Sequence, residues 1–328
     1  MNEFEDDDEE QLQSLPWYSP INLVGTGLNM HRRIKSMWTP TVHGDQPPVD
    51  YDYDGIDPFV KMGRDIWEAI RHNNVRNVEE LFIQHGTDCI NETWELPNGD
   101  TKSTFMMKAA EYGSIHVMRF LIECGADIHT LDCVGEQAIH YAARHCEPRC
   151  VLLLVNNGAD VRPHGVTPLH LACSKIGTKI EPTKILDTMK ILLDAGANAN
   201  AKDICVTYTT PLQMVIHGAI EPHLVGILPI SNGTYSNPVT RPVMDAVHML
   251  VNRGAHVNEP DTFNGGDTPL HQALGDNNVN MVVLLMSCGA MTNIPNRLGE
   301  TAMKIALRID QSANNHFWAD ILINNSIF

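Results

Sequence analysis

One short motif recurs along the chain and constrains its fold more than any other feature. Thr167-Pro168-Leu169-His170 is repeated as Thr268-Pro269-Leu270-His271, and weaker copies begin at residues 104, 137, 210 and 301. A Gly-Ala pair follows, and in three copies its glycine lies 21 residues after the motif begins. A fixed period of this length is typical of chains that stack one supersecondary unit many times.

Each copy predicts a pair of helices. The motif threonine can cap a first helix, and the next proline occupies the first turn, where no backbone donor is lost. An apolar stripe such as Val117, Phe120 and Leu121 predicts a second helix, which the glycine ends in a left-handed conformation. One unit alone cannot bury its faces, so Leu169 and Leu270 are expected to be buried between neighbouring units.

These motifs resemble the ankyrin repeat family over about residues 64–324. The resemblance implies an all-α fold, a solenoid of stacked helix-turn-helix units with short β-hairpin loops, which serves as a protein-binding surface. It also implies that the motif histidine ties loop to helix by hydrogen bonds. In the repeat domain, residues 61–328, we expect about seven units, at 64–91, 99–129, 132–161, 162–200, 205–258, 263–293 and 296–324.

Two units are longer than the others. From motif start to glycine they span 29 and 44 residues instead of 21, and the extra residues fall between the two helices, near 174–187 and 217–243. Because neighbouring units present this loop on the same edge of the stack, we expect the two inserts to lie side by side. The larger insert contains an apolar run in which Leu224 and Ile227 are candidate partner contacts. The alternative is that this run packs on neighbouring helices.

Residues 1–60 differ from the rest and are predicted to form an acidic, mostly disordered arm. They hold 12 acidic residues against three basic ones, and seven of the eight residues from Glu3 to Glu10 are carboxylates. Like charges at this density repel one another, and the prolines up to residue 48 interrupt helices. A solvated tail is the simpler interpretation. Docking through Trp17 or Trp38 on a partner or on the repeats is the alternative.

The overall charge excludes several classes of protein. Lys and Arg total 23 against 40 Asp and Glu, a net charge of −17, which argues against nucleic-acid and polybasic membrane-surface binding. The sequence contains no apolar run of bilayer length and no secretory signal pattern, and its eight cysteines form no CxxC pair. We therefore expect a cytoplasmic or nuclear protein, monomeric on its own, with neither nucleic acid nor membrane as a partner.

The sequence carries few signals for catalysis or metal binding. The sequence has no GxxxxGK[ST], HExxH or GxSxG motif and no kinase loop set. His140, His145, Cys146 and Cys150 lie close together in sequence and raise the question of zinc. Zinc sites usually show paired ligands at short fixed spacing, however, and His140 occupies the motif position. The sequence therefore predicts no metal, no cofactor and no catalytic residues.

The repeat register places candidate partner contacts on the concave face, where hairpin tips and first helices meet. They are Glu111, Tyr112, Arg144, His145, Ser174, Lys175, His217 and Asp276. The loop-tip positions add Asp100, Glu136, His164, Asn264 and Asp267. Tyr112, Arg144 and His145 are the strongest candidates, because aromatic and arginine side chains dominate interface energetics.

The sequence favours a non-enzymatic adaptor or scaffold that binds another protein, whose identity it does not reveal. One alternative is a cytoplasmic inhibitor of a transcription factor, because an acidic arm before ankyrin units resembles that layout. Another is a substrate receptor of a ubiquitin ligase, which usually carries a recruiting box after its repeats. A more remote alternative is an enzyme with a site built from the 217–243 insert.

Overall fold

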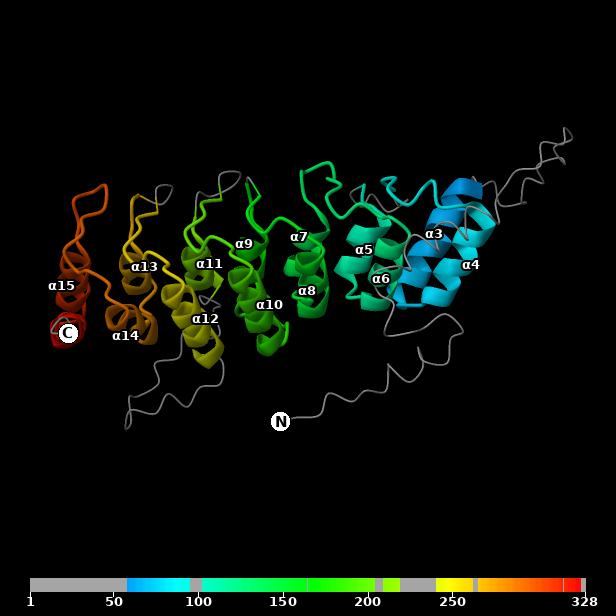
Figure 1. The fold of residues 1–328 in the computed structure, drawn as a ribbon. Helices are drawn as coiled ribbons and strands as arrows, with labels where there is room; N and C mark the ends of the chain where they lie inside the picture. The colour runs from blue at the N-terminus through cyan, green and yellow to red at the C-terminus, as the bar shows by residue number, and fades with distance from the viewer. Residues whose placement is uncertain are drawn as a thin grey trace, which may run out of the picture. The chain divides into compact units, whose positions relative to one another are not determined.

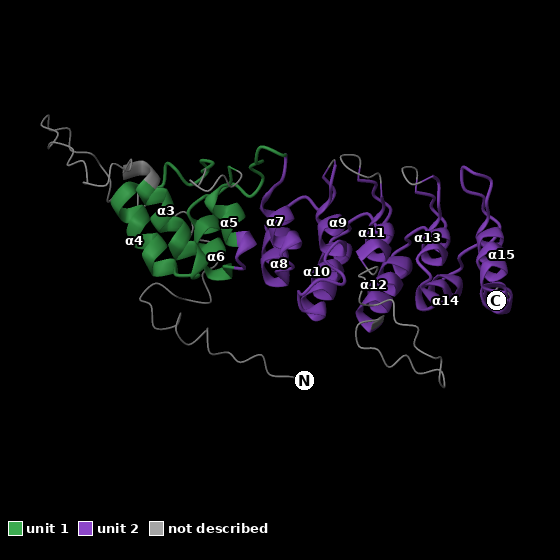
Figure 2. Ribbon diagram, turned by 180° about the vertical axis from the view of Figure 1, so that it is seen from behind, with its two compact units in different colours: residues 1–109, 114–134 green, residues 110–113, 135–328 purple. Residues whose placement is uncertain are grey.

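The computed structural model describes residues 58–94, 102–163, 165–203, 209–218, 240–261, 265–314 and 316–325. The chain divides into two compact units (Figure 2). Unit 1 comprises residues 1–109 and 114–134, and unit 2 comprises residues 110–113 and 135–328. In the described parts of both units the regular structure is helical, with isolated antiparallel bridges in place of a sheet.

Unit 1 is built around paired helices. They are α3 (Pro58–Arg71), α4 (Val75–His85), α5 (Phe105–Glu111), whose last two residues belong to unit 2, and α6 (Ile115–Glu123). The ring of Phe82 lies 6.1 Å from that of Phe105 and 6.0 Å from that of Phe120, which forms the aromatic centre of the unit. Helix α3 begins within residues expected to belong to the arm. Proline suits the first turn of a helix, and the fully buried Ile66 and Ile70 anchor α3 to the unit.

Unit 2 repeats one arrangement, a short first helix followed by a second helix (Figure 1). Its helices are α7 (Ala138–Arg144), α8 (Pro148–Asn156), α9 (Pro168–Cys173), α10 (Pro182–Asp194), α11 (Pro211–Gly218), α12 (Thr240–Asn252), α13 (Pro269–Gly275), α14 (Val279–Ser287), α15 (Ala302–Ala313) and α16 (Phe317–Asn325). The first helices α7, α9, α11, α13 and α15 pack in chain order, and α10 packs between α8 and α12.

The sequence signals for helix ends act as predicted. The Thr167 hydroxyl accepts a hydrogen bond from the His170 backbone N–H, which caps α9. Gly158 and Gly196, which follow α8 and α10, have φ values of 89° and 91°. Leu169 and Leu270 have no exposed surface. These observations confirm the prediction of an all-α fold of stacked helix pairs.

Where the motif contains a histidine, that side chain ties its repeat to the following one. In His140 the Nδ1 atom accepts from the Gln137 backbone N–H at 3.0 Å, which leaves the Nε2–H to donate to a carbonyl of the following unit. His170 and His271 are held in the same way. The carbonyl partners are Val166 for His140, Ala201 and Thr209 for His170, and Glu300 for His271. These ties hold the first helices in register.

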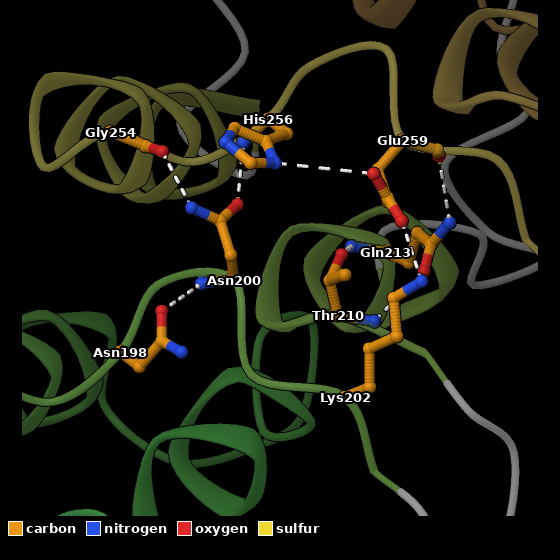
Figure 3. Close-up of polar contacts among 8 residues, drawn as sticks. All are labelled: Asn198, Asn200, Lys202, Thr210, Gln213, Gly254, His256 and Glu259. Carbon is orange, nitrogen blue, oxygen red and sulfur yellow. Dashed lines mark hydrogen bonds and ion pairs between the residues drawn. The ribbon is translucent and has the colours of Figure 1, made fainter.

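Additional polar contacts connect the α9–α10 pair to the α11–α12 pair (Figure 3). The Asn200 side chain donates to the Gly254 carbonyl and accepts from the His256 backbone N–H, both at 2.7 Å. The ammonium of Lys202 lies 2.6 Å from the Glu259 carboxylate. Asn200 thus fixes the turn after α12 to the turn after α10.

The first insert is part connection and part helix. Residues 174–181 join α9 to α10, and α10 has 13 residues where α8 has nine. Residues 182–187, expected to be part of the insert loop, are helical because Pro182 begins a new helix. The Ile176 carbonyl faces Gly218, where a Cβ would meet it at 2.7 Å. The connection therefore lies against the end of α11. Residues 219–239 of the second insert are outside the described residues.

Candidate partner-binding surface

Eight residues at the ends of the first helices form a series that we call the helix-end row. It consists of Glu111, Tyr112, Arg144, His145, Ser174, Lys175, His217 and Asp276, and all of them belong to unit 2. Each lies in the last turn of its helix or in the two residues after it. Tyr112, with 44% of its surface exposed, His145 and His217 are exposed, whereas the others are half-buried. Whether they bind a partner remains a prediction.

Arg144 is held by two side chains of its own unit. Its guanidinium donates to the carboxylate of Glu136 and lies 5.6 Å from the centre of the Tyr141 ring. The last unit repeats the ion pair eight residues apart, with Arg308 donating to Glu300 at 2.6 Å. The charge of Arg144 is therefore largely balanced, while its planar group is fixed at the surface.

His145 lies among charges of both signs. Partial burial lowers its pKa, and this is opposed by Glu111, which raises the pKa, and reinforced by Lys175 and Arg144. Its pKa thus depends on burial and on charged side chains at the ends of α5 and α7 and after α9. This part of the helix-end row is an electrostatically coupled surface.

Backbone contacts fix the side chains that follow α9. The Ser174 hydroxyl donates to the Leu171 carbonyl at 2.8 Å. The Lys175 backbone N–H donates to the Ala172 carbonyl at 3.1 Å, and the Lys175 carbonyl accepts from the Thr178 hydroxyl at 2.6 Å. Lys175 is therefore presented by a hydrogen-bonded turn.

The far end of the row is acidic. Asp276 caps the C-terminus of α13, and its backbone N–H donates to the Gln272 carbonyl at 2.9 Å. Partial burial raises the pKa of the Asp276 carboxyl, whereas the nearby His217 of α11 lowers it. The carboxylate is thus partly desolvated next to a group that can carry positive charge.

Two of the predicted loop-tip residues are bonded to other side chains of the protein, and several other predicted residues lie outside the described residues. Glu136 is committed to Arg144, and Asp267 accepts from the Asn296 side chain at 2.7 Å. The residues outside the described parts are Leu224, Ile227, Asp100, His164 and Asn264.

Sequence reasoning missed the side chains next to the row. Tyr141, Leu171 and Met214 occupy the variable position after the motif histidine or its equivalent, and Leu171 and Met214 are half-buried. The signal was present, because this position faces the same side of the first helix as the row. Leu171 and Met214 add apolar surface beside the charged side chains, whereas Tyr141 is buried.

The described residues offer little for metal or thiol chemistry. They contain no group of three or more His, Cys, Asp or Glu side chains arranged to hold a metal ion. Burial raises the pKa of the Cys146 and Cys150 thiols to about 12, so both are protonated at neutral pH and weakly nucleophilic. None of the described helices is both long enough and apolar enough to span a bilayer.

Comparison with solved structures finds the same fold. The chain superposes on the ankyrin repeat domain of Bcl-3, described as a unique member of the IkappaB protein family, with a TM-score of 0.57 and 24% identity. That match covers 79% of this chain and 97% of the other. The human ASB11 ankyrin repeat domain matches with a TM-score of 0.55 and 22% identity, over 79% of this chain and 96% of the other.

Curated relatives resemble most of the chain at low identity. Ankyrin repeat and SOCS box protein 16 of Homo sapiens is 27% identical over 76% of this chain. The B-cell lymphoma 3 protein homolog of Mus musculus is 26% identical over 58%, and palmitoyltransferase ZDHHC13 of Homo sapiens is 26% identical over 67%. The chain spans 60%, 36% and 37% of their respective lengths.

Family models cover more than half of the sequence. A model described as ankyrin repeats in three copies matches residues 66–163 and 106–203, and a model of many copies matches residues 239–286. These matches contain the motifs at residues 104, 137, 167 and 268, together with the helices that those motifs begin. The chain therefore belongs to the ankyrin repeat family.

Proposed function

We propose that this protein is a non-enzymatic adaptor or scaffold that binds another protein through the helix-end row. The observation that carries the proposal is the row itself, in which Tyr112 is exposed and Arg144 is fixed at the end of α7, the helix that His140 ties to the following repeat. Aromatic and arginine side chains contribute most to protein interfaces, and a pre-ordered arginine loses little freedom on binding. Ankyrin repeats are protein-interaction modules, and membership of that family supports the same proposal.

Two finer functions use the same surface. The relatives named ankyrin repeat and SOCS box proteins favour a substrate receptor of a ubiquitin ligase, in which the repeats select the substrate. The relatives named B-cell lymphoma 3 favour an inhibitor of a transcription factor, which fits the acidic run at residues 3–10. In both cases the protein acts as a monomer in the cytoplasm or nucleus. The free thiols of the described cysteines support a reducing compartment.

The test is affinity purification from the native cell. The wild type is compared with a double variant, Arg144→Glu with His145→Glu, and with Arg253→Glu as the matched control. Arg253 also forms an ion pair, with Asp194, but it lies at the end of a second helix. Variants are accepted only when their melting temperatures lie close to that of the wild type.

We expect the principal partner to be lost from the double variant and retained by Arg253→Glu. Retention of the same partners by both variants contradicts the proposal. The identity of the captured protein distinguishes the finer functions, because ligase subunits favour the substrate receptor and a DNA-binding factor favours the inhibitor.

A further inference from the structure

Two positive charges on and beside the helix-end row are balanced by carboxylates of the protein. Arg144 pairs with Glu136, and Lys184 of α10 lies 3.1 Å from the carboxylate of Glu147. In each pair the positive and negative side chains neutralise one another, which leaves little net charge there for a partner to recognise.

Two half-buried charges of the row differ from the others. Among the described residues neither Lys175 nor Asp276 forms an ion pair, although both lie in the row between neighbouring side chains. The neighbour that acts electrostatically on Asp276 is His217, which carries full positive charge only when protonated. Partly desolvated charges without a counter-charge are costly, and a partner that brings opposite charges recovers that cost.

The spacing between these two charges follows from the packing of the helices. Lys175 follows α9, Asp276 follows α13, and α11 packs between those two helices. Packed helices lie about 8–10 Å apart, so two such steps separate the charges by about 20 Å. An extended peptide advances about 3.3 Å per residue and covers that separation in about six residues.

We infer that the helix-end row binds an extended segment of a partner protein with an acidic side chain on Lys175 and a basic side chain about six residues away on Asp276. This inference rests on the proposed function and specifies the chemistry of its partner. Between the two charges, the segment passes over α11, where half-buried Met214 offers apolar contact. Both charged ends are held by backbone hydrogen bonds, so the spacing between them is fixed before binding.

The acidic run of the chain itself does not satisfy this pattern. Residues 3–10 supply carboxylates, but no Lys or Arg occurs before Arg32. A segment that satisfies Lys175 from this run therefore leaves Asp276 without a basic partner six residues away. The two-charge pattern points to another protein.

The experiment is selection of a displayed library of random 16-residue peptides on the full-length protein. Enriched peptides are expected to carry an acidic and a basic residue about six positions apart, in one consistent order. Affinities of the best peptide are then measured for Lys175→Glu and Asp276→Lys, beside Lys179→Glu and Asp187→Lys. Lys179 is an exposed positive charge on the same connection as Lys175 and serves as its control. Asp187 is an exposed negative charge on α10 and serves as the control for Asp276.

Each variant of the row should weaken binding about fivefold to tenfold, and each control less than twofold. Replacing the peptide's acidic residue by lysine should weaken binding to the wild type and restore binding to Lys175→Glu. Enriched peptides without the paired charges, or equal losses at Lys175 and Lys179, overturn the inference while leaving partner capture through the row intact. Absence of any enrichment also overturns it, whereas the proposed function is judged separately by affinity purification.

Discussion

The side-chain amide of Gln213 donates to the Glu259 carbonyl at 3.2 Å, in the position where neighbouring units use a histidine. Gln213 also accepts from the Thr210 backbone N–H at 2.8 Å, as the Nδ1 atom of His170 does from Thr167. One unit thus makes the link between units with an amide that does not titrate. Glutamine in place of the motif histidine can therefore keep the hydrogen bonds while removing the group that binds a proton.

Replacing the motif histidines by glutamine should make the fold less sensitive to acid. Burial lowers the pKa of His140 and of His170 below the ordinary value near 6.5. Below about pH 6.5 the unfolded chain therefore binds more protons at these histidines than the folded chain does. The free energy of unfolding that the neutral histidines contribute above that pH is lost as pH falls through their lowered folded-state pKa. The variant with His140→Gln and His170→Gln should lose less melting temperature between pH 8 and pH 5.

The control for this prediction is His217→Gln, because His217 is exposed at the end of α11. It should retain the acid sensitivity of the wild type. Equal pH profiles for the double variant and the wild type would show that other groups govern acid unfolding.

Leu270→Ala should destabilise the protein by about 2–5 kcal/mol, because Leu270 is fully buried in α13 and its removal leaves a cavity. The matched control is Leu298→Ala, since Leu298 is 80% exposed. Denaturant unfolding measures both changes. A Leu270→Ala variant as stable as the control would contradict the burial of Leu270 in α13.

Gly218→Ala should destabilise the joint between the first insert and α11. Its Cβ would lie 2.7 Å from the Ile176 carbonyl oxygen, a backbone atom, so residues 174–181 must shift at a cost of about 1–3 kcal/mol. Gly275 is the last residue of α13, as Gly218 is of α11, and a Cβ at Gly275 meets nothing within 4 Å. Gly275→Ala should be neutral or slightly stabilising, because alanine restricts the unfolded chain. Similar melting temperatures for the two variants would refute the contact.

Asn200→Ala should destabilise the repeats by about 1 kcal/mol, because it removes the hydrogen bonds to Gly254 and His256. Asn293 occupies the equivalent position after Gly289-Ala290 and is exposed, so Asn293→Ala serves as the control and should change stability by less than 0.5 kcal/mol. Thermal unfolding at neutral pH distinguishes them. A larger loss at Asn293 would contradict the role assigned to Asn200.

Local chemistry explains why the sequence predicted so much of the fold. A cap such as Thr167, the proline after it and a glycine such as Gly196 act within a few residues of their own positions. The fixed period then predicts that Leu270 is buried, because every unit presents the same face to the next. Departures from the period located the first insert, but the helix that begins at Pro182 made its loop shorter than expected.

The sequence by itself determined the repeating helix pairs, their caps and the buried leucines, because these depend on residues close in sequence and on a pattern common to all units. Only the tertiary structure decided which surface charges are free. Arg144 is balanced by Glu136, eight residues away, and Lys184 by Glu147, 37 residues away, whereas Lys175 has no such partner among the described residues. The tertiary structure also placed Ile176 of the first insert against Gly218. Such contacts depend on how side chains from different units meet, and a pattern that treats all units alike does not contain that information.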